Sequence, residues 1–487
     1  MSQSVSRRSF LGSIAFGSAA TALEPPAQAQ APAAGASVSI SLHPDKVVAT
    51  VPVNYNGLSY ESAQLAHPEF FAPTNKPLIA FFRQLTKEGV LRIGGNTSEF
   101  AIWSPGGAPT GGAAESAVGP DAGGTRQQTT ITPEAIRNLS GFLNATGWQL
   151  IYGLNMGHGN PGRAAEEARA VADSVGSRLI AFQIGNEPDL YHRNGLRPPD
   201  WTFDDYFSQW HEFFEAVRKA VPNASFGAPD VASNTDWIVE FAKKGADDIV
   251  LLSGHYYAEG PPTDPRMTIS RLLQRDPRLL ANVPRIMEAS RKSHRPFRMT
   301  EGNSCYKGGK PGVSNTFASA LWAADYMLFL AQSGYAGVNF HGGGNGVYTP
   351  IAGSIEAGFS SRPIYYGLLL GEQFAGSKMV ETQADATGVN ATAYAAKTDS
   401  GLRVAIFNKD ERQPIQATLH PRMKTRNATV WRLAAPSVDS ETGVRFAGGE
   451  ASPEGLWSPH QEQPLTETQG QYAIDLPAAS AALIFLS

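Results

Sequence analysis

The chain of 487 residues has a single cysteine and no strong excess of charge of either sign. Because Cys305 is alone, no intrachain disulfide can form, and the fold depends on buried surface and hydrogen bonds. Forty Lys and Arg residues against 44 Asp and Glu residues give a formal net charge of −4, which offers no electrostatic basis for binding nucleic acid or an anionic membrane. We expect a monomer with neither kind of partner.

Long apolar runs are also missing, apart from a mild stretch near the first residue. Residues 6–11, SRRSFL, form a twin-arginine pattern, the mild apolar stretch follows over 12–23, and residues 27–29, AQA, offer a small-residue cleavage site. The stretch is too short and too rich in Gly, Ala and Ser to span a bilayer. The pattern predicts a twin-arginine signal peptide at 1–29 and export by a bacterium to the periplasm or beyond.

What the sequence does contain is a repeated alternation of short apolar strands and amphipathic helices between residues 55 and 373. Eight strands are predicted, over 56–60, 90–93, 149–154, 179–184, 225–228, 249–253, 297–300 and 337–340. Such an alternation favours a closed (β/α)8 TIM barrel. The alternative is an open doubly wound sheet. Such a sheet is expected to have a glycine-rich phosphate-binding turn after its first strand, and residues 56–60 do not have that pattern.

Both ends of the chain show a β pattern without helical periodicity. Residues 30–54 combine a Pro/Ala linker with two predicted strands, over 37–42 and 46–53, and residues 374–487 contain at least six more short strands. These segments predict an accessory β-sandwich built from both chain ends. A Gly/Pro/Ala-rich insertion at 104–125 follows the second barrel strand, so it belongs to the active-site face as a lid or subsite wall, or as a plain flexible loop.

Two glutamates follow barrel strands at the carboxyl end, where α/β barrels place their chemistry. Glu187 comes after the strand at 179–184, and Glu301 comes after the strand at 297–300. The simpler alternative is that each glutamate caps a following helix. A pair of carboxyl groups about 5–5.5 Å apart suits a retaining glycosidase, in which one attacks the anomeric carbon and the other, with a raised pKa, protonates the leaving oxygen.

The sequence Asn186-Glu187 after the fourth strand, with Glu301 after the seventh, resembles glycoside hydrolase clan A, and in detail family 79, the β-glucuronidase and heparanase family. The resemblance extends over nearly the whole chain after the signal peptide. It implies that Glu187 is the general acid/base and Glu301 the nucleophile. It also implies that Asn186 binds the sugar 2-hydroxyl and that Tyr257 donates a hydrogen bond to the nucleophile.

Two glycine-rich loops resemble the uronate-binding loops of this family. One is 306–309, YKGG, and the other is 342–348, GGGNGVY, with Tyr306, Gly308 and Tyr348 as the matching positions. Glycines let a carboxylate approach backbone N–H groups, and the tyrosines add hydroxyl donors, although a lone glycine run is also typical of a flexible turn. Glu61 and Asn96, which follow the first two strands, are candidates for holding sugar hydroxyls, or for loop caps.

We expect no cofactor and no metal. His158, His255 and His341 each follow a barrel strand, but the short ligand spacing typical of zinc sites is missing. The leading hypothesis is a retaining exo-β-glucuronidase acting on a glucuronic-acid-containing glycan or glycoside. The alternatives are an endo-acting heparanase-like enzyme, a neutral-sugar clan A β-glycosidase and a non-catalytic carbohydrate-binding protein.

Overall fold

The computed structural model describes residues 36–106, 128–343 and 346–487, which belong to one compact unit. The predicted signal peptide at 1–29, most of the linker and most of the 104–125 insertion lie outside the described residues. Among the described helices, none combines the length and the apolar composition needed to cross a bilayer.

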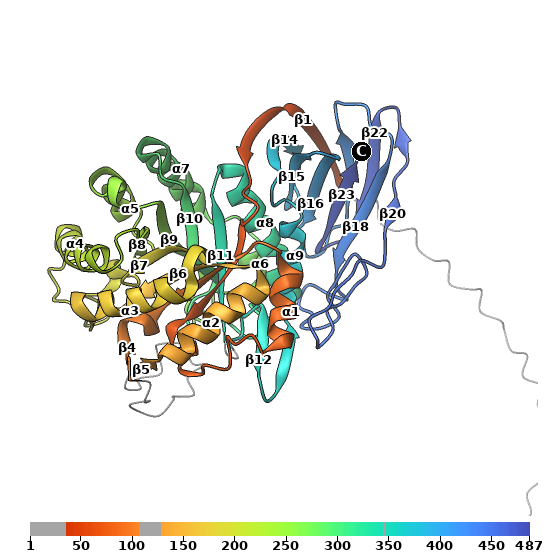
Figure 1. Ribbon diagram of the computed structural model, residues 1–487. Coiled ribbons are helices and arrows are strands. Elements are labelled where there is room, and N and C mark those ends of the chain that lie inside the picture. Colours follow the sequence, from red (N-terminus) through yellow and green to blue (C-terminus); the bar gives the residue numbers. More distant parts are fainter. Residues whose placement is uncertain (1–35, 107–127, 344–345) are drawn as a thin grey trace, which may run out of the picture. The chain divides into compact units, whose positions relative to one another are not determined.

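Eight parallel strands close into a barrel in the order β10-β11-β2-β3-β6-β7-β8-β9 (Figure 1). Every strand predicted for the barrel is present, and the predicted TIM barrel is confirmed. The strands are β2 (Asn56–Glu61), β3 (Val90–Gly94), β6 (Gln149–Leu154), β7 (Leu179–Ile184), β8 (Phe226–Val231), β9 (Leu251–Glu259), β10 (Phe297–Cys305) and β11 (Gly337–Gly342).

Helices connect these strands along the outside of the barrel. The main ones are α1 (Lys76–Leu85), α2 (Pro133–Thr146), α3 (Pro161–Val175), α4 (Phe203–Ala220), α5 (Thr235–Lys244), α7 (Pro277–Ser293), α8 (Phe317–Ser333) and α9 (Pro363–Glu372). In α4, Thr202 and Asp205 form a capping box at the first turn, an arrangement that contributes about 1 kcal/mol. Its buried residues recur every three or four positions, so one apolar stripe faces the barrel.

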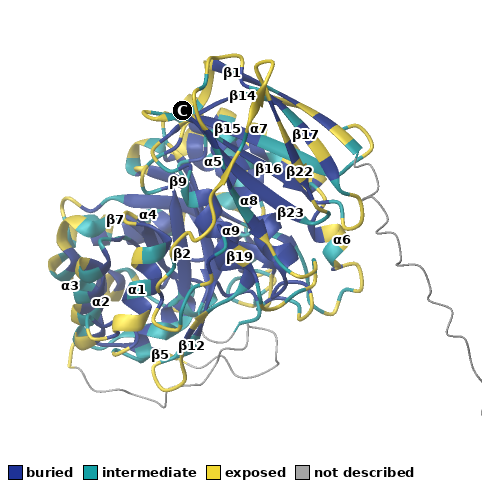
Figure 2. Ribbon diagram, turned by 90° about the vertical axis from the view of Figure 1, so that its right-hand side faces the viewer, coloured by how far each residue is buried: buried dark blue, intermediate teal, exposed yellow. Residues whose placement is uncertain are grey.

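The last two helices differ from the others because they are apolar on nearly all sides. Nearly all residues of α8 and α9 are buried (Figure 2). Helix α8 contacts barrel strand β10 and also β1 (Ala36–Thr50), β14 (Lys378–Asp385) and β15 (Ala391–Thr398) of the second domain. A helix packed on both sides needs apolar residues all round, and these two helices form the layer between barrel and sheet.

The second domain is an eleven-stranded sheet whose path includes both ends of the described chain. Strand β1 runs antiparallel to β14 and parallel to β17 (Ile415–His420). Val38, Ile40 and Leu42 of β1 pack in one core with residues of β16 (Gly401–Asn408), β17, β22 (Gln471–Leu476) and β23 (Ser480–Leu486). The accessory β domain built from both chain ends is therefore confirmed.

One detail of the β prediction is wrong. The sequence pattern predicts two separate strands at 37–42 and 46–53, whereas β1 is a single strand that ends at Thr50. Residues 43–46, HPDK, which suggest a turn, lie at a register shift between His43 and Val47 in the pairing with β14. A bulge accommodates Pro44 inside the strand, because an irregularity in the ladder tolerates a residue without an N–H group.

Candidate active site

Glu187 and Glu301 meet at the carboxyl end of the barrel, where their side chains are largely buried. Glu187 follows β7 and Glu301 lies within β10. One oxygen of each carboxylate and one ring nitrogen of His255 all lie within 4.8 Å of one another. The helix-cap alternative is wrong for both, because Glu187 makes no side-chain cap hydrogen bond and Glu301 is inside a strand, far before α8 begins.

The backbone at Glu187 is in the left-handed region, with φ 50° and ψ 51°. This conformation is uncommon for a residue with a side chain and persists only where neighbouring groups fix it. The N–H of Glu187 donates to the carbonyl of Asp230 at 3.0 Å, and Asp230 itself has a positive φ of 57°. The two strand ends β7 and β8 therefore hold each other in place.

Glu99, which the sequence analysis missed, fixes the same loop from the other side. Its buried carboxylate accepts hydrogen bonds from the N–H of Asn186, from the N–H groups of Met156 and Gly157, and from the Tyr191 hydroxyl. Three strand-end loops thus converge on one carboxylate. Nothing in the sequence alone marks Glu99, because its partners come from loops that only the tertiary fold brings together.

Arg92 is the central cation of the site and was also missed. Its guanidinium donates to Glu301 Oε2 at 2.7 Å, to Asn186 Oδ1 at 2.7 Å and to Asp230 Oδ2 at 2.6 Å. The side chain is 1% exposed, and Gln183 Oε1 accepts from its Nε at 3.1 Å. The sequence contains a sign of this role, because Arg92 is a charged residue in the otherwise apolar strand of residues 90–94, VLRIG.

The surroundings of the two glutamates shift their pKa values in opposite directions. Burial alone would raise the pKa of Glu301, but His341, His255 and Arg92, together with a 2.8 Å hydrogen bond from the Tyr257 hydroxyl, lower it to about 2. Burial raises the pKa of Glu187, and His255 opposes this shift only in part. One carboxylate is therefore kept ionised, while the other favours its protonated form.

The three predicted tyrosines lie close together beside Glu301. The ring of Tyr257 lies 6.2 Å from that of Tyr348 and 6.4 Å from that of Tyr306. The N–H of Tyr348 donates to the carbonyl of Gly308 at 3.3 Å, so the loops carrying 306–309 and 346–348 touch. Gly308 has a φ of 84°, which favours glycine, and Tyr306 is 37% exposed at the mouth of the site. Residues 344 and 345 of the second loop lie outside the described residues.

Glu61 and Asn96 sit next to each other at the rim. Glu61 Oε2 accepts hydrogen bonds from the N–H and the hydroxyl of Thr97, and Oε1 lies 3.5 Å from His341 Nε2. Asn96 opens a short 3-10 helix (Asn96–Phe100) and is half-buried. Asn186 Nδ2 is buried and has no hydrogen-bond partner within the part of the chain that the structure describes.

Two of the three histidines, His255 and His341, approach the same atom, Glu301 Oε2, at 4.0 and 3.6 Å. His158 Nδ1 contacts the carbonyl of Glu99, His255 lies between Glu187 and Asp230, and His341 lies between Glu61 and Glu301. In the described residues, the one group with the spacing for a metal ion is Glu187, His255 and Glu301. Two of its three members are the paired glutamates, and the third is His255. Our expectation that the protein uses no metal stays a prediction.

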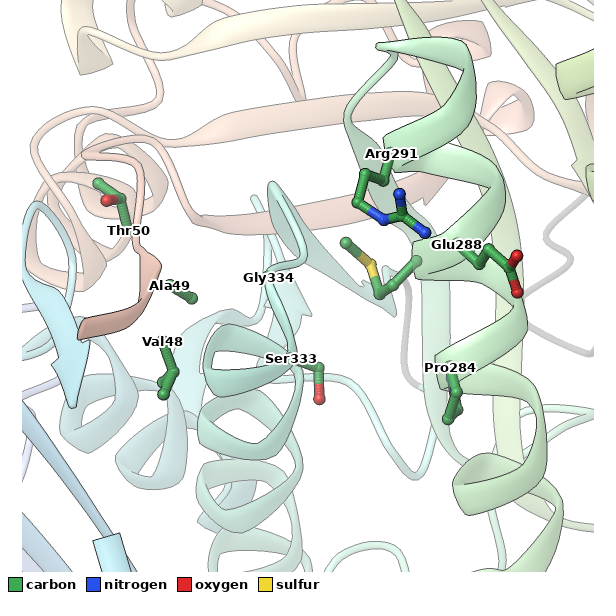
Figure 3. A pocket seen from close by; sticks show the side chains of 9 residues that line it. Val48, Ala49, Thr50, Pro284, Glu288, Arg291, Ser333 and Gly334 are labelled. Carbon is green, nitrogen blue, oxygen red and sulfur yellow. The ribbon is translucent and has the colours of Figure 1, made fainter. Parts of the chain in front are cut away.

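A groove of about 490 Å³ lies away from these carboxylates. It is lined by Val48, Ala49 and Thr50 of β1, by Pro284, Met287, Glu288 and Arg291 of α7, and by Ser333 and Gly334 (Figure 3). Gly334 precedes β11, so this groove is on the amino-terminal side of the barrel, opposite to the paired glutamates. This groove is therefore not part of the site that contains Glu187 and Glu301.

Comparison with known proteins gives matches over both domains. The model of the glycosyl hydrolase family 79 C-terminal beta domain matches residues 392–483. A β-glucuronidase of Aspergillus niger is 25% identical over 489 positions, which cover 87% of this chain and 88% of that protein. Mouse heparanase is 25% identical, but the match covers 52% of this chain and 48% of heparanase.

Solved structures with the same fold act on different sugars. A 4-O-α-L-rhamnosyl-β-D-glucuronidase of Fusarium oxysporum superposes with a TM-score of 0.71 at 19% identity, covering 92% of this chain and 100% of that one. A family 51 arabinofuranosidase of Xanthomonas axonopodis pv. citri gives a TM-score of 0.68 at 16% identity, covering 93% and 100%. The fold alone therefore does not select the sugar.

Proposed function

We propose that this chain, a glycoside hydrolase of the family 79 type, is a retaining exo-β-glucuronidase. The family resemblance and the enzyme class predicted from the sequence are confirmed by the matches above. The observation that carries the proposal is the pair Glu187 and Glu301, with oxygens within 4.8 Å and pKa values shifted in opposite directions. No cofactor is needed for this chemistry.

The pair suits a double displacement. In the first step, ionised Glu301 attacks C1 of the sugar while protonated Glu187 gives its proton to the leaving oxygen. In the second step, a water molecule attacks C1, Glu187 takes the proton of that water and Glu301 is released. The short separation supports retention, since an inverting pair needs room of about 6.5–9.5 Å for the water.

Further residues have assigned roles in this proposal. The hydroxyl of Tyr257 keeps Glu301 ionised and in place, because it donates to the charged form. The unpartnered Nδ2 of Asn186 is available for the sugar 2-hydroxyl, and Arg92 fixes the amide by binding its oxygen. We assign further sugar hydroxyls to Glu61 and Asn96 at the rim.

Selection of a glucuronide requires groups that recognise its carboxylate. We assign this role to Tyr306, Gly308 and Tyr348, whose loops touch each other next to Tyr257 and Glu301. The choice of a glucuronide as the substrate is supported by the likeness to β-glucuronidases of Aspergillus niger and Neurospora crassa, at 25% and 27% identity. Exo action is preferred over heparanase-like endo action because the net charge of −4 does not provide extended basic subsites.

The test compares hydrolysis of aryl β-D-glucuronide, aryl β-D-glucoside and aryl α-L-arabinofuranoside by the purified enzyme. We expect a strong preference for the glucuronide, lost in Glu187→Ala and Glu301→Ala but kept in Glu212→Ala, an exposed glutamate on α4. Preference for a neutral glycoside would reject the carboxylate assignment and keep the mechanism. An α-configured first product in NMR would reject retention.

Loss of function in single hydroxyl variants tests the carboxylate loops separately. Tyr306→Phe and Tyr348→Phe should raise KM for the glucuronide by about tenfold, the size of one lost hydrogen bond to a charged group, and leave any glucoside activity unchanged. Equal effects on both substrates would show that these tyrosines support the loops only.

We also propose that residues 1–29 direct export by the twin-arginine route. Mass spectrometry of protein from the culture medium or periplasm should give a chain that starts at Gln30. Replacement of Arg7 and Arg8 by lysine should retain the precursor inside the cell, and unchanged export would reject the assignment.

A further inference from the structure

A line of three side chains leads from Glu187 into the barrel. Nδ1 of His255 lies 3.0 Å from Glu187 Oε1, and Nε2 of the same ring lies 3.1 Å from Asp230 Oδ1. The exposed fraction is 0% for the His255 side chain and 1% for that of Asp230, so no solvent reaches this contact. One imidazole therefore lies between two carboxylates: Nδ1 hydrogen-bonds to Glu187, whereas Nε2 is at ion-pair distance from Asp230 but forms no hydrogen bond of regular geometry within the described residues.

Asp230 is held as an anion in a fixed orientation. Its Oδ2 accepts from Arg92 Nη2 at 2.6 Å, and its Oδ1 accepts from Thr300 Oγ1 at 2.6 Å and from Gln183 Nε2. Burial would raise the pKa of Asp230, but His255 and Arg92 lower it well below its usual range. The negative charge of Asp230, 3.1 Å from Nε2, favours a hydrogen on that nitrogen of His255, so Nδ1 is the nitrogen that faces Glu187.

We propose that Asp230 and His255 are positioning residues that make Glu187 one part of a proton-sharing unit. The inference rests on the proposed function, because it concerns how the acid/base residue is supplied with its proton. One proton stays on Nε2 toward Asp230, and a second proton is shared between Nδ1 and the Glu187 carboxyl. Of these three residues, Glu187 is the one that contacts the substrate, and Asp230 and His255 act through it.

Each proton that Glu187 gives up in the first step of the reaction returns to it in the second. As the C1–O bond breaks, its electron pair goes to the leaving oxygen, which takes the shared proton from Glu187 while Glu301 bonds to C1. In the second step, a water oxygen bonds to C1, the bond from C1 to Glu301 breaks, and the proton lost by that water returns to Glu187. The unit then holds the same two protons as at the start, and no further reactant is required.

The charges around His255 are compatible with such sharing. The groups that face or influence the ring are Glu187 and Asp189 after β7, Asp230 on β8, Glu301 on β10 with Oε2 at 4.0 Å, and Arg92 on β3 through Asp230. Burial would lower the pKa of His255, but Asp230 and Glu301 raise it to about 10. The pKa of Glu187 is also raised, so the second proton stays within the pair around neutral pH.

The experiment measures kcat/KM of the full chain on two aryl β-D-glucuronides. The 2,4-dinitrophenyl group leaves without a proton, whereas the phenyl group needs one. We expect His255→Asn to lose about 100-fold on the phenyl glycoside, the lower end of a general-acid contribution, and only a few-fold on the dinitrophenyl glycoside. The alkaline limb of the pH profile should also move to higher pH, because His255 lowers the pKa of Glu187 and a neutral amide at that position does not. His158→Asn, a histidine at a neighbouring strand end, should leave the ratio of the two substrates unchanged.

A second variant keeps the inference testable if His255→Asn does not fold. Asp230→Asn should change the same ratio in the same direction, because the amide no longer fixes the proton on Nε2. Only variants with the wild-type circular dichroism spectrum are compared. The inference is overturned if such a variant loses equal activity on both substrates, or if the alkaline limb of its pH profile does not move. If the wild-type enzyme prefers aryl glucosides, the proposed sugar is wrong, and the same ratio is then measured on phenyl and dinitrophenyl glucosides.

Discussion

Nη1 of Arg92 lies 2.7 Å from Glu301 Oε2, at a place where the two side chains are 1% and 4% exposed. The same guanidinium also binds Asp230 and the amide oxygen of Asn186. Two buried anions thus depend on one buried cation. This relationship links the stability of the barrel interior to the ionisation of the proposed nucleophile.

Replacing Arg92 should therefore cost both stability and activity. Arg92→Met leaves Glu301 and Asp230 without their common partner, and breaking a buried pair from one side costs about 3–5 kcal/mol. Urea unfolding measures this loss, and kcat on an aryl β-D-glucuronide measures the loss of activity. Arg92→Lys keeps the charge but not the forked geometry, so its stability should lie between those of Arg92→Met and the wild type. A stability equal to the wild type in Arg92→Met would contradict the expectation.

Tyr257→Phe should reduce kcat without unfolding the protein. The variant removes the 2.8 Å hydrogen bond to Glu301 Oε1, and a hydrogen bond to a charged group contributes about 1.5–3 kcal/mol, or roughly 10- to 150-fold in rate. Because this hydrogen bond helps to lower the pKa of Glu301, the acid limb of the pH profile should move to higher pH. The neighbouring Tyr256 donates to Asp276 instead, so Tyr256→Phe is the matched control and should keep both values.

The opposed pKa shifts predict how activity and stability depend on pH. The acid limb of kcat/KM should lie near pH 2, where Glu301 becomes protonated, and the alkaline limb should follow deprotonation of Glu187. The lowered pKa of Glu301 contributes stability above its unfolded value of about 4.3, and this contribution is lost as the pH falls toward 2. The raised pKa of Glu187 changes the stability with pH in the opposite direction. Its contribution to the free energy of unfolding is present at low pH and is lost as the pH rises through the pKa of the folded state.

The variant Glu187→Gln separates the two contributions. A neutral amide removes the cost of burying an ionised carboxylate, so the variant should be more stable than the wild type at alkaline pH and nearly equal to it at pH 4. Thermal unfolding at several pH values measures this difference. A constant difference across the range would show that ionisation of Glu187 is not coupled to folding.

The sequence predicted the parts of the fold and site that follow from periodicity. Eight apolar runs alternate with helices, and the carboxyl ends of parallel strands converge, so this pattern predicts that Glu187 and Glu301 lie at the same end of the barrel. The hydrogen bond from Tyr257 to Glu301 was expected from the family resemblance instead. Arg92 and Asp230 were missed because their role depends on which side chains of a tilted strand face the barrel interior. Glu99 depends on the path of three loops, which no local pattern encodes.

The last prediction concerns a buried ion pair at the contact between the barrel and the sheet domain. Asp325 on α8 is buried and accepts from Lys409 Nζ at 2.8 Å, from the Tyr394 hydroxyl at 2.8 Å and from Arg275 Nη2 at 3.1 Å. Lys409 and Tyr394 belong to the sheet domain, whereas Arg275 and Asp325 belong to the barrel. Burial would raise the pKa of Asp325, but these cations lower it well below its usual range.

Asp325→Ala should leave Lys409 buried without a counter-ion and cost about 3–5 kcal/mol. Its unfolding should remain a single transition, because the sheet and the barrel share the apolar layer of α8 and α9. For the same reason, we propose that a chain cut at Phe374 is insoluble, since it exposes that layer. Calorimetry of Asp325→Ala and expression of residues 30–374 test the two statements. Two separate transitions, or a soluble and active barrel fragment, would show that the domains are independent.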